Sequence, residues 1–158
     1  DLHKEYRRQR QMCIRDSNKP IPSPQGESDF YWQKAKDHEL WIRKCNHCNR
    51  AYFYPRDISP CCFSRNTSWI KASGEATLFS YGIVHRSPHP AFNEDSPYVV
   101  AIVQLAEGPK MPTNIITQET PTPENIRIGM PLQVIFEDIS DEISLVKFTP
   151  ITWFNSNT

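Results

Sequence analysis

Four cysteines lie close together in the sequence at a spacing that suits metal binding. Cys45 and Cys48 form a Cys-x-x-Cys pair, and Cys61 and Cys62 follow after twelve intervening residues. Asn49, directly after the first pair, tolerates the left-handed conformation that such a turn needs. Four thiolates from two turns make a closed tetrahedral zinc site with no open position for catalysis. The sequence therefore predicts one structural zinc ion, held by these four cysteines and supplying folding energy to a segment with little core.

The second cysteine pair departs from the usual ribbon pattern, because Ser59 stands where a regular zinc ribbon has a cysteine. Serine is a poor zinc ligand, so three outcomes stay open. Cys61 is the third thiolate, or three thiolates bind zinc together with an outside ligand, or the ribbon holds no metal and residues 52–55 keep it together. A rubredoxin-like iron electron carrier needs four thiolates, and the same serine weakens that alternative.

No arrangement typical of an active site occurs in the sequence. It has no Ser/His/Asp order, no His-Glu-x-x-His and, with 5 glycines, no phosphate-binding glycine loop. His85 and His89 have one acid nearby, Asp95, and no nucleophile. We therefore expect no catalytic residue in this chain, and Cys13, far from the cluster, is assigned no role.

The elements that must position the cysteines are mainly β. Ser28 is expected to cap a helix that runs to about Asp37, and a short strand at 40–42 leads into the first cysteine pair. Alternating or continuous apolar runs predict five later strands, at 77–83, 98–105, 111–117, 132–137 and 143–148. The pattern predicts an N-terminal helix and a small zinc ribbon followed by a five-stranded OB-fold barrel, with an SH3-like barrel as the alternative.

The expected domain organisation has four parts: a flexible arm at 1–27, a helix and rubredoxin-like ribbon at 28–70, the barrel at 71–150, and an apolar tail at 151–158. Within the arm, residues 11–17 match no pattern in the rest of the sequence. An artefact of gene assembly is one explanation for this segment, and it is assigned no function.

Aromatic residues at two places predict a docking surface for a partner subunit. Three adjacent rings on a helix cover more than one packing face. The residues concerned are Phe30, Tyr31 and Trp32 of the helix, with Trp153 and Phe154 of the tail. The alternative is that these rings cover the core of their own chain.

The net charge of +0 hides an asymmetry along the chain. Residues 1–50 carry 11 basic and 7 acidic side chains, whereas residues 74–150 carry four and ten, a net charge of −6. Because such a barrel repels a polyanion, we expect no nucleic-acid partner, which leaves a single-stranded nucleic-acid-binding module as the weaker alternative. The sequence contains no run of about 18 apolar residues, the length that a membrane-spanning helix needs, and no export signal is recognised in it. We therefore expect a cytoplasmic location.

Several motifs together resemble a known family. They are Phe30-Tyr31-Trp32, Cys45-x-x-Cys48, Tyr54-Pro55-Arg56, Ser73-Gly74-Glu75-Ala76-Thr77, Pro97-Tyr98-Val99-Val100-Ala101 and Gly129-Met130-Pro131. In these motifs, over about residues 28–150, the chain resembles the zinc-ribbon plus OB-fold proteins that accompany acyl-CoA enzymes. The resemblance implies a non-catalytic accessory subunit in a hetero-oligomer with a thiolase-like, aldolase or hydratase partner. It also implies help in binding or channelling an acyl-CoA intermediate of lipid, steroid or aromatic-acid metabolism.

Contact with the coenzyme phosphates would need cations, preferably arginine with its planar fork. The candidates are Arg56, Arg65, Lys71 and Arg86. Arg86 lies in the connection between the first two barrel strands, a loop that OB folds use for ligands. The alternative is an ordinary solvated loop.

Overall fold

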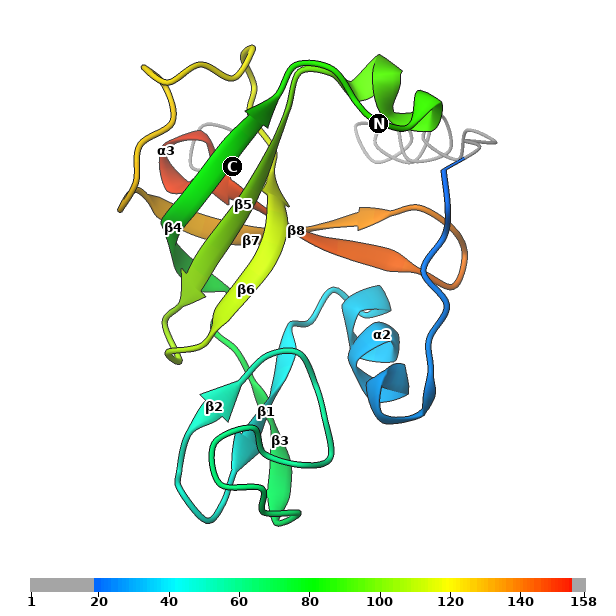
Figure 1. The fold of residues 1–158 in the computed structure, drawn as a ribbon, viewed down its shortest axis with the longest axis vertical. Helices are drawn as coiled ribbons and strands as arrows, with labels where there is room; N and C mark the ends of the chain where they lie inside the picture. The colour runs from blue at the N-terminus through cyan, green and yellow to red at the C-terminus, as the bar shows by residue number, and fades with distance from the viewer. Residues whose placement is uncertain (1–18, 155–158) are drawn as a thin grey trace, which may run out of the picture.

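The computed structural model describes residues 19–154, which form two β modules arranged along the long axis of the molecule (Figure 1). The first module is a three-stranded antiparallel sheet with the order β2-β1-β3. Its strands are β1 (Trp41–Cys45), β2 (Ala51–Tyr52) and β3 (Thr67–Lys71). Strand β1 ends at the first cysteine, as the apolar alternation before it predicts.

The second module is a closed five-stranded barrel. Its strands are β4 (Glu75–Val84), β5 (Tyr98–Leu105), β6 (Lys110–Ile115), β7 (Pro131–Asp138) and β8 (Ser144–Pro150). The order around the barrel is β4-β5-β6-β8-β7, with β6 parallel to β8 and every other pair antiparallel. This crossover, which places β8 and not β7 beside β6, is the Greek-key connectivity of an OB fold. The five predicted strands are confirmed, and the SH3-like alternative is wrong.

Strand β5 lies between β4 and β6 in the barrel, and it is covered on one side only. Val99 and Val103 point into the core, with 1% and 0% of their surface exposed. Val100 and Ile102, on the opposite face, are 42% and 41% exposed. The nearly continuous apolar run of β5 is therefore buried on one face only.

Helix α2 (Asp29–Lys36) follows a 3₁₀ turn, η1 (Gly26–Ser28), and packs against β1 of the ribbon and β7 and β8 of the barrel. Tyr31 and Ala35, four positions apart on one side of the helix, are buried. The predicted cap is wrong, because Ser28 makes no capping bond and its hydroxyl donates to the Gln25 carbonyl instead.

A single cluster of buried side chains joins the ribbon to the barrel. It includes Tyr31 of α2 and Ile42 of β1 together with Leu78 of β4 and Phe148 of β8. Residues from both modules therefore share one core, and α2 contributes to it from the boundary between them.

The remaining helices lie at the periphery. The 3₁₀ helix η2 (Pro90–Asp95) belongs to the connection between β4 and β5, at the end of the barrel away from the ribbon (Figure 1). Helix α3 (Ile151–Phe154) packs against β7 and β8, and the side chains of Trp153 and Phe154 lie outside the described residues, as do Cys13 and most of the predicted arm. Among residues 19–154, no helix is long and apolar enough to span a bilayer.

Candidate metal centre and the groove beside it

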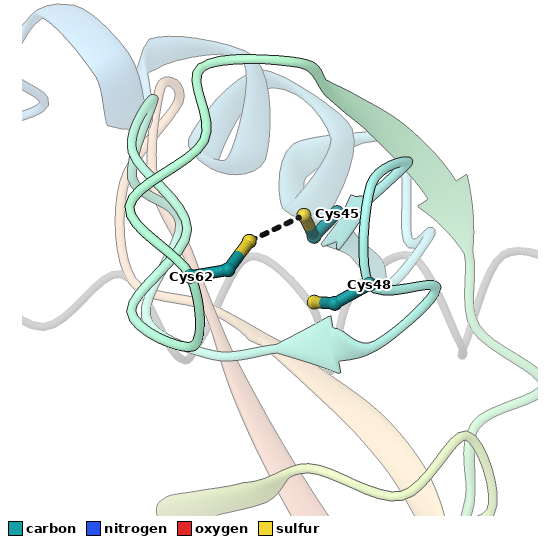
Figure 2. A group of neighbouring side chains, drawn as sticks. All are labelled: Cys45, Cys48 and Cys62. Carbon is teal, nitrogen blue, oxygen red and sulfur yellow. Dashed lines mark hydrogen bonds between the residues drawn. The ribbon is translucent and has the colours of Figure 1, made fainter.

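Three of the four predicted cysteines converge on one point of the ribbon. Cys45 comes from the end of β1, Cys48 from the turn after it, and Cys62 from the loop that precedes β3 (Figure 2). Their sulfur atoms all lie within 4.8 Å of one another, and Sγ of Cys45 is 3.5 Å from Sγ of Cys62. Asn49 has a φ of 57°, which confirms the left-handed turn expected after the first pair. The three sulfurs could hold a metal ion.

Ser59 lies beside the three sulfurs. It is fully buried, and its hydroxyl oxygen is 3.9 Å from Sγ of Cys62. A backbone hydrogen bond from Cys48 and a side-chain hydrogen bond from Ser59 lower the pKa of the Cys45 thiol to about 6. Because the thiolate is the form that binds metal, these contacts favour the ligand state of Cys45. The serine thus occupies the position beside the cluster where a regular ribbon has its fourth sulfur.

Cys61 does not join the other three cysteines. Its side chain is exposed, and its sulfur accepts a hydrogen bond from Nη1 of Arg50 at 3.4 Å. Because Cys61 and Cys62 are consecutive in a tight loop, their side chains leave the backbone in different directions, and only one of them reaches the cluster. The third sulfur is therefore Cys62, and the alternative with Cys61 in that role is not what the structure has.

The four cations proposed for coenzyme phosphates are not brought together. Arg56 pairs with Glu27, and Lys71 pairs with Glu39. Arg65 is exposed in the loop after Cys62, whereas Arg86 is exposed in the β4–β5 connection at the far end of the barrel (Figure 1). The four candidates therefore do not form one cluster, because two of them pair with carboxylates distant in sequence and the other two lie apart.

The aromatic residues of α2 pack mostly within their own chain. The Phe30 ring lies 4.7 Å from that of Trp69, between centroids, and 5.6 Å from that of Trp41. Tyr31 is 4% exposed, so it offers almost no surface to a partner, and its predicted docking role is wrong. The alternative, in which the helix rings cover the core of the chain, describes Phe30 and Tyr31, while Trp32 is half-buried.

A groove that the sequence analysis missed lies between the ribbon and the barrel. Its volume is about 280 Å³, and its ribbon side consists of Tyr31, Trp32, Phe53 and Tyr54. Residues 111–114 of β6 and 145–147 of β8 form its barrel side. These segments lie far apart in sequence, and no local pattern indicates that they meet.

Comparison with known proteins matches both modules to one family. Residues 32–68 match the description "ChsH2, rubredoxin-like zinc ribbon domain", and residues 69–137 match "ChsH2, C-terminal OB-fold domain". A DUF35 domain-containing scaffold protein of Pyrococcus furiosus is 34% identical over 77% of this chain and 90% of its own length.

Two further relatives carry names that refer to enzymes. A probable enoyl-CoA hydratase alpha subunit of Thermomonospora curvata is 33% identical over 84% of this chain, which spans only 40% of that longer protein. A solved structure titled "Ltp2-ChsH2(DUF35) aldolase" contains a chain that is 33% identical, with a TM-score of 0.71 over 83% of this chain and 99% of that chain. This protein therefore belongs to the DUF35 family and carries the zinc ribbon and OB-fold domains described for ChsH2.

Proposed function

We propose that this chain is a non-catalytic accessory subunit that docks on an acyl-CoA enzyme subunit of the hydratase, aldolase or thiolase-like kind. The observation that carries the proposal is the bare apolar face of β5, where Val100 and Ile102 are 42% and 41% exposed. A soluble partner that covers this face would remove both side chains from water. Adjoining apolar surface of this kind is typical of protein–protein contacts.

The neighbours of these two side chains carry no charge. Val100 lies opposite Gly82 of β4 and Asn114 of β6. Ile102 lies opposite Ser80 of β4 and Pro112 of β6. Depletion of charge at the centre of a patch is what distinguishes the core of an interface from other surface. Lys110 of β6 lies on the same face two residues from Pro112, so the uncharged part is limited to the surroundings of Val100 and Ile102. In a barrel with ten acidic side chains, this uncharged part supports a contact with the enzyme subunit.

The names of the relatives support the class of partner. The Thermomonospora curvata relative is named as a hydratase subunit, and the matching solved structure is named as an aldolase. By this analogy, the partner of the present chain acts on an acyl-CoA, and the accessory subunit helps to bind or channel the acyl-CoA intermediate in lipid, steroid or aromatic-acid metabolism.

The metal centre has a structural part in this proposal. Cys45, Cys48 and Cys62 would hold a zinc ion, with the Ser59 oxygen or an outside ligand beside them. Convergent thiolates suit zinc, and a metal bound there would link the end of β1 to the loop before β3. It would fix the shape of the ribbon and carry out no chemistry on the substrate.

Affinity purification of the tagged full chain from its native host tests the proposal. We expect a hydratase, aldolase or thiolase-like subunit to co-purify in a stable ratio, as identified by mass spectrometry. With the purified pair, the double variant Val100→Asp, Ile102→Asp should abolish complex formation on size-exclusion chromatography, while Ile128→Asp, at a 69% exposed site in the connection between β6 and β7, should not. Recovery of no acyl-CoA enzyme, or an unaffected complex with the double variant, would contradict the proposal.

A further inference from the structure

The barrel side of the groove consists of two strand edges that do not pair with each other. The ladder between β6 and β8 contains one residue pair, Ile115 with Phe148. Upstream of that pair the two edges separate, and residues 111–114 and 145–147 line the groove. Pro112 has no N–H group and so cannot extend the ladder across the gap.

The backbone of β8 leaves one hydrogen-bond donor facing the groove. Val146 accepts a hydrogen bond at its carbonyl from Oγ1 of Thr113 at 3.0 Å, and Phe148 accepts one from the N–H of Ile116 at 2.8 Å. Both carbonyls of β8 therefore point toward β6, and each already accepts a hydrogen bond within the chain. In an extended strand the N–H of a residue points to the same side as its carbonyl, so the Val146 N–H also faces the groove.

The ribbon side adds an aromatic wall with a hydroxyl group. Tyr31 is 4% exposed, and its hydroxyl has no hydrogen-bond partner among the described residues. Among the described residues, Glu107 has the one side-chain oxygen or nitrogen that is both shielded from water and without a hydrogen-bond partner. The Tyr31 hydroxyl, which also has no partner, is therefore not shielded from water, and the groove that Tyr31 lines gives access to it. Burial first, and then the neighbouring Tyr54, raises the pKa of Tyr31, so the phenol stays a neutral donor.

The groove has little charge to offer. Lys147 is the one charged residue that lines it, and its ammonium group is already paired with Glu137. The groove therefore lacks the free cation that a phosphate group needs. The volume of about 280 Å³ lies just below the usual range for small-molecule sites of about 300–1,000 Å³, which favours a slender ligand over a ring system.

We propose that this groove binds the pantetheine arm of an acyl-CoA, with the adenine nucleotide held elsewhere. The inference rests on the proposed function and assigns its ligand contact to the gap between β6 and β8. Pantetheine is uncharged, linear and slender, and its two amides resemble those of a peptide strand. Its two amide carbonyls accept hydrogen bonds from the Val146 N–H and the Tyr31 hydroxyl, while Trp32 and Tyr54 cover its methylene groups.

Titration of the isotope-labelled full chain with pantetheine, followed by amide and indole NMR shifts, tests this inference without any partner subunit. We expect saturable shifts at the amides of Thr113, Asn114 and Val146 and at the Trp32 indole. Tyr54→Ala, at a site 41% exposed, should weaken pantetheine binding about tenfold. Phe79→Ala, at a site 45% exposed on the barrel and outside the groove, is the matched aromatic control and should leave the affinity unchanged.

A second ligand tests the nucleotide half of the coenzyme on its own. We expect 3′-phosphoadenosine 5′-diphosphate to leave the groove signals unmoved, and Leu145→Trp, which fills the groove, to abolish the pantetheine shifts in a folded protein. Shifts caused by the nucleotide alone, or pantetheine binding that survives Leu145→Trp, would overturn the inference. Partner capture without any pantetheine response would refute the inference and leave the docking proposal standing, whereas the reverse result would refute docking alone.

Discussion

The imidazole Nε2 of His38 lies 2.9 Å from Oδ1 of Asp138, joining the second residue after α2 to the end of β7 across 100 positions of sequence. The His38 ring is nearly parallel to that of Phe136, with centroids 5.3 Å apart. Ser144 donates its hydroxyl to the same carboxylate, and Nζ of Lys36 lies 3.6 Å away. Because α2 also supplies Tyr31 and Trp32 to the groove, this contact helps to set the spacing between its two walls.

The Asp138 contact predicts acid-sensitive stability. Burial alone would raise the pKa of Asp138, but hydrogen bonds from Ser144 and His38, with the charges of His38 and Lys36, outweigh it and hold the pKa below its ordinary value of 3.8. The ionised carboxylate therefore stabilises the fold above about pH 4, and this contribution is lost as the pH falls through the lowered pKa.

Asp138→Asn should accordingly cost about 0.5 kcal/mol at pH 7, the range of a solvent-exposed pair, since the carboxylate is 37% exposed. Urea unfolding at pH 7 and at pH 3 measures the effect. The gap between the wild type and the variant should narrow at pH 3, and a gap that widens there would contradict the assignment. Asp37→Asn, at the surface-exposed pair with Lys34, is the matched control.

Ser59→Cys is expected to complete a four-thiolate centre. Ser59 is buried beside Cys62, so a sulfur at this position would join the existing three. Zinc affinity should rise by more than about tenfold, because contacts outside the ligand shell already change affinity by about 10–100-fold. Competition with a chelator measures the change. Cys61→Ser should leave zinc affinity unaltered, and a large loss in that variant would instead make Cys61 a ligand.

Gly74→Ala should destabilise the joint between ribbon and barrel. Gly74 has a φ of +83°, and an added Cβ would lie 2.4 Å from Cγ1 of Val134. Left-handed strain and overpacking together should cost about 2–4 kcal/mol. At Gly82 an added Cβ meets only Val100, at an ordinary 3.6 Å, so Gly82→Ala should cost less than about 1 kcal/mol in the same thermal or urea unfolding experiment. Equal losses in the two variants would count against this account.

Arg43→Lys should weaken the ribbon although it keeps the charge. Arg43 is 9% exposed, its Nε donates to the Arg56 carbonyl at 3.3 Å, and its guanidinium lies 4.7 Å from the Trp69 ring centroid while also pairing with Asp57. A lysine cannot make all three contacts, so we expect a loss of about 1–2 kcal/mol in unfolding free energy. Lys44→Arg, on the same strand, serves as the control. An Arg43→Lys variant with the unfolding free energy of the wild type would show that the planar group is dispensable.

The sequence by itself determined the helix, most of the strands and the place of the cysteine cluster. Residue alternation is a local property, so the five barrel strands and β1 could be predicted, and the left-handed Asn49 follows from the chemistry of the Cys45–Cys48 turn. The tertiary structure decided what depends on side-chain direction and distant partners. It selected Cys62 over its neighbour Cys61, turned Tyr31 inward, and neutralised Arg56 with Glu27. It also formed the groove from segments of α2, β6 and β8 that meet only when the barrel closes, because contacts between residues about 80 positions apart leave no local periodicity to detect.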